Sequence, residues 1–421
     1  MFEGLAFRPA DILIPKSGFE KWSVVACDQH TSEPEYWEET KRTVGDAPSA
    51  LRLVLPEAWL KDEEDTARRV AAINARMRSA LAEGLLRALP GALIYVERTL
   101  TTGLTRRGLV GAIDLEKYDY SGESRTLIRP TEGTVLERIP PRVKIRRGAP
   151  LEIPHVMMLI DDPQDAVIGP AARARDELKK LYDFELMQGG GKIRGFLLDG
   201  RTASETARAL KILESRETFD KKYGAGRGPV MAYAVGDGNH SLAAAKRCWE
   251  LTKAELTQKQ VLCHPARYAL VELVNLHDES LGFAPIHRVV FGVDPEKLLG
   301  ELFRYYPQAS VGAGNPGAQY VYSGGSGSFC FGHEGLAAGL LQDFLDDYTS
   351  RRGGSVDYVH GDDVARRLGA GEGAAAFLLP AMRKDELFRS VIRDGSLPRK
   401  TFSMGRAQDK RYYLECRKIT L

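Results

Sequence analysis

Apolar runs and apolar stripes alternate along this chain of 421 residues and predict its elements. The clearest stripe lies in residues 63–89, where Val70, Ile73, Met77 and Leu81 recur at helical spacing. Short apolar runs with the length of buried strands occur throughout the chain. The predicted strands are 22–26, 92–97, 107–113, 156–160, 229–235, 267–276, 289–291, 374–379 and 411–416, and further helices are expected at 171–184 and 295–306.

The order of these elements predicts the fold class and the domains. Because helices and strands are intermixed, and 92–97 and 107–113 are expected to pair antiparallel, we predict an α+β fold with mixed sheets. The chain is too long for one simple core. We therefore divide it into an N-terminal α+β domain (1–160), a central segment (161–292) and a C-terminal α+β domain (293–421).

A turn with two glycines joins the strand at 229–235 to a helix carrying Leu242, Ala245 and Trp249 on one face. Backbone N–H groups at a helix start lie outside its hydrogen-bond ladder and favour an anion. One interpretation is therefore a phosphate site, and the other is a capped helix with Asp237 or Ser241 as the N-cap. The residues of this turn are Gly236, Asp237, Gly238, Asn239, His240 and Ser241.

A second polar turn, 27–30, follows the predicted strand 22–26 and gathers Cys27, Asp28 and His30. Asp28 is the favoured functional member, as a general base or metal ligand. The alternative is that Asp28 and Thr31 cap the next helix, for which Ser32 and Glu35 have the spacing of a capping box.

Two further polar groups are weaker candidates. Arg129 could clamp a phosphate, and Glu132 on the same turn could hold a metal. His287 and Arg288 precede a predicted strand and could face the same ligand as the glycine turn.

The glycine-rich segment 187–192 does not meet the requirements of a P-loop. Leu186 stands where that motif needs glycine, and Ile193 stands where it needs Ser or Thr. The segment is either a surface turn or a mobile lid. A third glycine is also missing after Gly236 and Gly238, so a dinucleotide cofactor is not supported. The segment 312–327 is expected to be a hairpin or mobile loop.

Charge and cysteine content narrow the class of protein. The net charge is +2, from 59 basic and 57 acidic residues, so no global field attracts nucleic acid or an anionic membrane. No apolar run is long enough for a membrane span. Five scattered cysteines without a Cys-x-x-Cys pair indicate a reducing compartment, and we expect a cytoplasmic protein.

The chain resembles a bacterial and archaeal family known as domain-of-unknown-function family 1015. The resemblance extends over nearly the whole chain, including the segments 22–29, 46–57, 106–110, 236–241, 285–289, 375–380 and 397–402. The family is similar in turn to the ParB/sulfiredoxin-like superfamily, which includes partition proteins that hydrolyse CTP, sulfiredoxins and kinases of free serine. This implies a nucleotide-binding core in which a turn opening a helix holds the phosphates.

The chain departs from the commoner family form, Asp-Gly-His-His-Arg, in this turn. It keeps Asp237, Gly238 and His240 but has Asn239 and Ser241. The missing arginine is a strong phosphate ligand. The positive charge would then have to come from Arg129, Arg288 or Lys246.

Together, the motifs and the resemblance predict a phosphotransferase that uses a nucleoside di- or triphosphate and Mg²⁺ to phosphorylate a small hydroxylated metabolite such as free serine. The alternative is a regulatory protein that binds a nucleotide or metabolite without catalysis. No nucleic-acid or membrane partner is expected, and a homo-oligomer is compatible with the sequence. The expected roles are catalysis for Asp28, Asp237 and His240, cofactor binding for Gly236, Gly238, Asn239, Ser241, Arg129, His287 and Arg288, and metal binding for Asp237 and Glu132.

Overall fold

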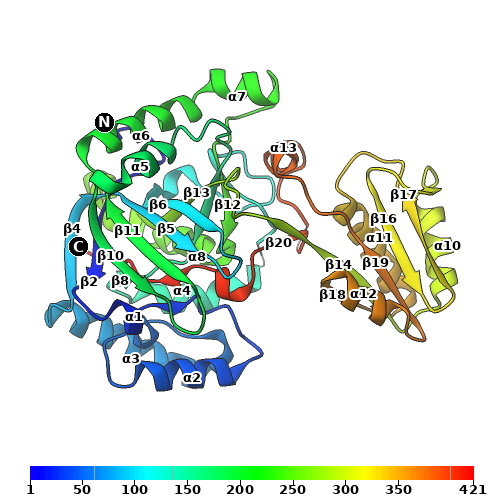
Figure 1. Cartoon of the computed structure of the whole chain (residues 1–421), viewed down its shortest axis with the longest axis horizontal. Helices are drawn as coiled ribbons and strands as arrows, with labels where there is room; N and C mark the ends of the chain where they lie inside the picture. The colour runs from blue at the N-terminus through cyan, green and yellow to red at the C-terminus, as the bar shows by residue number, and fades with distance from the viewer. Residues whose placement is uncertain (61, 135, 399) are drawn as a thin grey trace. The chain divides into compact units, whose positions relative to one another are not determined.

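The computed structural model describes residues 1–60, 62–134, 136–398 and 400–421. It divides the chain into two compact units: unit 1 comprises Met1–Leu281 and Gly405–Leu421, and unit 2 comprises Gly282–Met404. This division differs from the predicted boundaries at 160 and 292. Strands from both sides of residue 160 pair within one sheet, and the last residues of the chain return to unit 1 (Figure 1).

The main sheet of unit 1 contains nine strands in the described residues, in the order β10-β11-β5-β6-β13-β9-β12-β7, with β1 paired to β6. The pairs β12–β7 and β13–β9 are parallel and the others are antiparallel, which confirms the α+β class with mixed sheets. The strands are β1 Phe7–Arg8, β5 Ile94–Thr99, β6 Thr105–Asp114, β7 Ile128–Pro130, β9 Met157–Ile160, β10 Lys179–Glu185, β11 Lys192–Leu197, β12 Tyr233–Asp237 and β13 Tyr268–Asn275.

Each face of this sheet buries its own core. Ile94 and Val96 of β5 join one cluster of buried side chains, whereas Tyr95 between them joins the other. In β6, Val110 likewise belongs to the first cluster and Leu109 to the second. Because successive side chains of a strand point to opposite faces, central strands covered on both sides read as continuous apolar runs.

Helices and small sheets cover the two faces. α2 and α3 pack on the first core through Trp37, Ile73 and Met77, while α8 packs on the second through Leu242 and Trp249. No helix among the described residues has the length and apolar character needed to cross a membrane. The helices of unit 1 are α1 Phe19–Trp22, α2 Pro34–Val44, α3 Glu63–Ala82, α4 Ile139–Arg147, α5 Gly169–Ala174, α6 Gly200–Leu213, α7 Arg216–Tyr223, α8 Asn239–Lys253 and α9 Gln258–Cys263.

The segment Gly405–Leu421 is built into unit 1 by strand pairing and by buried arginines. Arg98, only 1% exposed, donates to the carbonyls of Gly190, Gln408 and Lys410, and its guanidinium lies over the ring of Tyr412. These contacts fix the position of the C-terminal segment. The small sheets are β2 Ala10–Pro15 with β4 Leu86–Ala92, β3 Val24–Val25 with β21 Tyr412–Tyr413, and β8 Leu151–Glu152 with β22 Arg417–Lys418.

Unit 2 has its own sheet and its own core. Its strand order is β15-β17-β16-β19-β14-β18, with β20 paired to the start of β14. Phe329, Phe344 and Phe377 lie in the larger of its buried clusters. The elements are β14 Phe283–Phe291, α10 Pro295–Tyr305, β15 Ser310–Val311, β16 Gly317–Tyr322, β17 Gly325–Cys330, α11 Ala337–Arg352, β18 Ser355–His360, α12 Asp362–Gly369, β19 Ala374–Leu378, α13 Lys384–Asp394 and β20 Phe402–Met404.

Two predicted helices are wrong in part. The helix predicted over 63–89 ends at Ala82, because Gly84 adopts the left-handed conformation (φ +64°) that terminates a helix, and β4 follows. In the helix predicted over 171–184, α5 ends at Ala174 and β10 begins at Lys179. A register shift between positions 180 and 182 of β10 puts neighbouring apolar residues inside together, and this mimics helical spacing.

The first predicted strand also differs. Trp22 ends α1, and only Val24–Val25 form a strand. The capping box does not form, because α2 begins at Pro34 with Glu33 as its N-cap and no side-chain cap bond. By contrast, the antiparallel pair β5–β6, the strand–turn–helix β12–α8 and the hairpin β16–β17 are confirmed.

Candidate functional site

The junction of β12 and α8 is a tight turn at Gly238. Gly238 has φ +80°, and a Cβ added there would lie 3.1 Å from the Cα of Val156. The first bond within α8 runs from the Leu242 amide to the Gly238 carbonyl at 2.9 Å. The helix has no side-chain cap, so the capped-helix interpretation with Asp237 or Ser241 as N-cap is wrong. The first-turn amides therefore lie outside the helix ladder, where an anion can bind.

Asp237 ends β12 and pairs with a lysine from the other end of the chain. One carboxylate oxygen accepts the Gly238 amide at 2.9 Å, and the other lies 3.1 Å from Lys410 Nζ. Gly236, at the preceding position, is half-buried in the same strand. The structure thus places a cation beside the glycine turn, although Ser241 replaces the family's arginine.

Asn239 and His240 begin α8. The Asn239 side-chain amide donates to the Val235 carbonyl at 3.5 Å. The Oδ1 of Asn239 is buried and has no hydrogen-bond partner in the part of the chain that the structure describes. His240 is half-buried in the same turn. A buried acceptor without a donor is costly, so a ligand donor or a cation near Asn239 would satisfy it.

Asp28 meets the same turn through His155. Asp28 Oδ2 lies 3.5 Å from His155 Nε2, and Ser241 Oγ lies 3.3 Å from that same nitrogen. Hydrolases with a catalytic triad instead place the carboxylate on one ring nitrogen and the serine on the other. The arrangement here therefore does not support Ser241 as a nucleophile.

The second ring nitrogen of His155 is bound by a tyrosine. Tyr413 Oη lies 2.9 Å from His155 Nδ1, and the same hydroxyl contacts the Cys27 thiol at 2.9 Å. Burial alone would lower the pKa of His155, but the charge and hydrogen bond of Asp28, with the charge of Asp237, raise it. His155 is thus favoured as an imidazolium.

The pKa of Asp28, the carboxylate of this pair, shifts in the opposite direction. Burial alone would raise the pKa of Asp28, but His155, the Gln29 side chain and Lys410 together hold it below its usual range. Asp28 is therefore ionised at neutral pH. The two carboxylates, Asp28 and Asp237, thus each have a basic partner, His155 and Lys410, within 3.5 Å and 3.1 Å.

Cys27 does not fit a nucleophilic role. Burial, reinforced by the neighbouring Asp28 charge, raises the pKa of its thiol to about 12. A thiolate is the reactive form of cysteine, and it is scarce at such a pKa. Asp28 remains the functional candidate of this turn.

An apolar cavity of about 180 Å³ adjoins the cluster. Cys27, His155, Ser241 and Tyr413 line one side of it. Much of the remainder is apolar, including Leu53, Met77, Ile145, Leu242 and Ala245. An apolar group of about six to eight carbons fits a space of this size.

Glu132 and Arg129 flank the turn on the neighbouring strand. β7 runs parallel to β12 with Pro130 opposite Val235, so Asp237, the last residue of β12, and Glu132, two residues after β7, are placed at the same end of these two strands. Arg129 is 4% exposed and donates to the carbonyls of Thr126 and Pro229. These hydrogen bonds hold β7 in place, and they engage the Arg129 guanidinium with backbone carbonyls.

A self-contained metal cage is absent from the described residues, which contain no group of three His, Cys, Asp or Glu side chains arranged for a metal. Mg²⁺ is commonly held by one or two carboxylates together with phosphate oxygens and water. Among the described residues, the Asp237 carboxylate and the unsatisfied Asn239 Oδ1 supply oxygens of this kind at the turn.

His287 and Arg288 are placed in unit 2, within β14. His287 contacts Asp362 at 3.0 Å and accepts the Leu379 amide at 3.1 Å. Arg288 is fully buried and donates to the carbonyls of Ile286 and Lys400. These contacts hold unit 2 together, and the structure does not bring the pair to the Asp237 turn within one unit.

The remaining candidates have structural contacts. Lys246 donates to the Leu115 carbonyl and pairs with Glu250, so its charge is engaged along α8. The loop 187–192 is a tight turn between β10 and β11, and a Cβ on Gly190 would lie 2.4 Å from the Tyr412 hydroxyl oxygen. The packing of Gly190 favours the surface-turn interpretation of this segment.

Three residues of this site were missed from the sequence: His155, Lys410 and Tyr413. They lie in segments without a local motif, and only tertiary contacts bring them to the turn. The one available signal was the Pro154–His155 pair directly before an apolar strand, because polar residues at strand ends often belong to sites.

Comparison with solved structures gives distant likenesses. A free serine kinase in complex with AMP is 12% identical, with a TM-score of 0.38 and coverage of 74% of this chain and 91% of that chain. A conserved hypothetical protein from Pyrococcus furiosus is 13% identical, with a TM-score of 0.35 and coverage of 73% and 94%. SbnI with a C-terminal truncation, from Staphylococcus aureus, is 9% identical, with a TM-score of 0.39 and coverage of 74% and 87%.

These overlaps are too low to carry an argument about the site. No curated protein matches the sequence. The match to a family is extensive, because the family described as "Protein of unknown function (DUF1015)" covers residues 7–417. The chain therefore belongs to the DUF1015 family.

Proposed function

We propose that unit 1 binds a nucleoside di- or triphosphate at the first turn of α8 and transfers a phosphoryl group to a small hydroxylated metabolite. One observation carries the proposal: the Asp237–Lys410 pair and the Asp28–His155 pair converge on the same uncapped helix start.

The phosphates would lie on the amides of the α8 first turn. Lys410 supplies the positive charge that the family's arginine would otherwise bring, and its side chain is already oriented by Asp237. Asp237 and Glu132 would hold Mg²⁺ jointly with phosphate oxygens, and the ion would neutralise the phosphate charge. Phosphoryl transfer depends mainly on such positioning and charge neutralisation.

Asp28 would orient the acceptor. An ionised carboxylate can accept the hydrogen bond of a hydroxyl group and take its proton as the bond to phosphorus forms. His155 keeps Asp28 ionised and in place, while Tyr413 fixes the imidazole ring. His240, in the same turn, is expected to contact the phosphates.

The cavity beside Asp28 suggests which acceptor fits. Its apolar lining favours a hydroxylated metabolite that also carries an apolar group over free serine alone. An acceptor of this kind would bury its apolar part beside Leu242 and direct its hydroxyl toward Asp28.

Binding is tested by calorimetric titration with ATP, ADP and CTP, each with and without Mg²⁺. We expect Lys410→Ala to weaken binding about tenfold or more, because it removes a charge-assisted contact. Arg247→Ala, an exposed cation of the same helix, is the matched control and should change affinity less than about twofold. Absence of nucleotide binding, or equal effects of the two variants, would overturn the proposal.

Turnover is tested separately by ADP release in the presence of serine and of hydroxy acids with progressively longer apolar chains. Product is identified by phosphorus NMR. Activity that rises with apolar length supports the acceptor assignment. Nucleotide binding without any acceptor-dependent turnover would instead favour the regulatory alternative, a nucleotide-binding protein without catalysis.

A further inference from the structure

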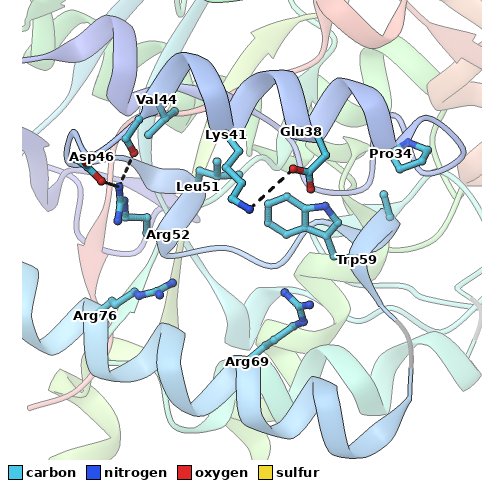
Figure 2. A pocket seen from close by; sticks show the side chains of 12 residues that line it. Pro34, Glu38, Lys41, Val44, Asp46, Leu51, Arg52, Trp59, Arg69 and Arg76 are labelled. Atoms are coloured by element: carbon cyan, nitrogen blue, oxygen red, sulfur yellow. Dashed lines mark hydrogen bonds and ion pairs between the residues drawn. The ribbon is translucent and has the colours of Figure 1, made fainter.

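A second cavity in unit 1 lies between α2 and α3 and has a volume of about 640 Å³ (Figure 2). This volume is within the range of small-molecule sites, roughly 300–1,000 Å³. Its walls come from α2, from the segment 45–59 and from one face of α3. None of its lining residues is shared with the cavity beside Asp28.

Cationic side chains converge on this cavity from three elements. Lys41 comes from α2 and Arg52 from the short helical turn η1 (Ala50–Arg52), while Arg69 and Arg76 come from α3. Residues seven positions apart fall on the same face of a helix. Figure 2 shows the guanidinium groups of Arg69 and Arg76 pointing from α3 into the space below α2.

The charges of this cavity are only partly compensated. Arg52 donates to the Gly45 carbonyl at 2.6 Å and lies 4.0 Å from Asp46, and Lys41 lies 3.8 Å from Glu38. Both of these ion pairs are long and exposed, so each contributes little.

The two arginines of α3 differ in their partners. Arg69 pairs with Asp65 at 2.6 Å on its own helix. Arg76 has no hydrogen bond or ion pair with the residues that the structure describes. Of the lining side chains, four are cationic and two are carboxylates. Asp65 is shared between Arg69 and Arg68, so including this pair still leaves an excess of two positive charges.

An aromatic wall accompanies the cations. Trp59 is half-buried, and its ring meets the buried Trp37 edge-on at 6.2 Å between centroids. It lines the cavity together with Val44 and Leu51. A tryptophan held in this way offers a surface on which a flat ring can stack.

We propose that this cavity is a binding site for an aromatic or heteroaromatic phosphate monoester, separate from the α8 turn. The phosphate lies among Arg52, Arg69 and Arg76, and the ring of the ligand packs on Trp59. Guanidinium groups match phosphate oxygens with paired hydrogen bonds. A phosphate monoester dianion also balances the excess of two charges.

The probe for this site is phenyl phosphate, titrated into the full chain while tryptophan fluorescence is followed. Phenol and inorganic phosphate are titrated in parallel. We expect phenyl phosphate to change the fluorescence and to bind at least about tenfold more tightly than phenol or inorganic phosphate. Only phenyl phosphate can contact both the arginines and the ring of Trp59. Affinity should fall as the pH drops below about 6, where the phosphate takes up a proton.

Matched variants identify the site. Arg76→Glu is expected to weaken phenyl phosphate binding about tenfold or more, whereas Arg78→Glu, exposed on the same helix outside the cavity, should leave it within about twofold. Trp59→Phe should abolish the fluorescence change while calorimetry still detects binding. Lys410→Ala should leave the fluorescence titration unchanged, which separates this site from the α8 turn.

The proposal is overturned by any of three results. These are no change with millimolar phenyl phosphate, equal effects of Arg76→Glu and Arg78→Glu, or loss of the signal in Lys410→Ala. The first two results leave nucleotide binding at α8 intact, since that is measured with other ligands, and the third would assign the phenyl phosphate signal to the α8 turn instead.

Discussion

Two buried histidines, one in each unit, have a carboxylate at the same ring nitrogen but differ at the other. His155 is 5% exposed and has Asp28 at 3.5 Å from Nε2, while His287 is 1% exposed and has Asp362 at 3.0 Å. His155 Nδ1 contacts the Tyr413 hydroxyl, whereas His287 Nδ1 accepts the backbone amide of Leu379. A hydroxyl can donate or accept, but an amide can only donate.

The two histidines differ in what the second ring nitrogen must do. The Leu379 amide requires an acceptor at His287 Nδ1, whereas the Tyr413 hydroxyl can either donate to His155 Nδ1 or accept from it. His155 can carry one proton or two without losing either partner. A carboxylate beside a histidine is therefore not enough to identify a functional site, because the partner of the second nitrogen decides.

The largest expected effect is on turnover, and it distinguishes Asp28 of unit 1 from Asp362 of unit 2. Asp28→Asn should lower phosphoryl-transfer turnover by about 10²–10⁴-fold, the usual contribution of a positioned acid–base group. Asp362→Asn removes the corresponding carboxylate of unit 2 and should change turnover less than about twofold. ADP release under saturating nucleotide measures both. Comparable losses in the two variants would contradict the distinction.

The next effect concerns stability. His287→Leu should destabilise the protein by about 1–3 kcal/mol, because it leaves the Leu379 amide buried without an acceptor. Urea unfolding followed by circular dichroism measures the change. Nucleotide affinity in the same variant should stay at the wild-type value. A stable variant with weakened nucleotide binding would show that His287 has a binding role after all.

The pH dependence of the His155–Asp28 pair is expected to have a definite sign. The raised pKa of His155 means that its contribution to folding is present at lower pH and is lost as pH rises through the folded-state value. The lowered pKa of Asp28 means that its contribution is lost only in acid, as pH falls through its own folded-state value. The pair therefore stabilises the fold in the window between these two values.

Asp28→Asn should remove this dependence. We expect the stability difference between wild type and variant to shrink as pH rises past the His155 pKa, because the ion pair loses its positive partner there. The imidazole signals of His155 in NMR report the same pKa directly, and its midpoint should fall in the variant. If the NMR titration midpoint of His155 is the same in Asp28→Asn as in the wild type, then Asp28 does not raise the pKa of His155.

The smallest effect is expected for Ser241. Its hydroxyl lies 3.3 Å from a nitrogen that Asp28 also approaches, so Ser241→Ala should lower turnover by no more than about fivefold. If Ser241→Ala lowers turnover as much as Asp28→Asn does, Ser241 would be a nucleophile. That result would contradict the geometry, in which Ser241 and Asp28 approach the same nitrogen of His155.

Local features of the sequence predicted the part of the site that is local in the chain. The strand, the glycine turn and α8 are consecutive, so the apolar run, the turn with two glycines and the helix could be predicted from residue types alone. Asp28 was found for the same reason, at the end of an apolar run. Lys410 and Tyr413 were not, because the pairing of β21 with β3 is a tertiary event without a local pattern.

The errors in the fold prediction have physical causes of the same kind. The shifted register in β10 changed the spacing of buried residues from that of a strand to that of a helix. His287 and Arg288 suggested a ligand because they are polar residues beside an apolar strand, but their partners, Leu379 and Lys400, come from distant segments of unit 2. Residue types show that a polar group is present, whereas its role depends on what packs against it.

The return of Gly405–Leu421 to unit 1 has a consequence for how the protein is made. A ribosome synthesises all of unit 2 before Lys410 and Tyr413 emerge, so a nascent chain holds Asp28, His155 and Asp237 without their final partners. During that interval Asp237 has no lysine and the imidazole of His155 has no tyrosine. Under the proposed function, a chain terminated before Gly405 lacks Lys410 and Tyr413 and should bind nucleotide poorly, even if most of its main sheet has assembled.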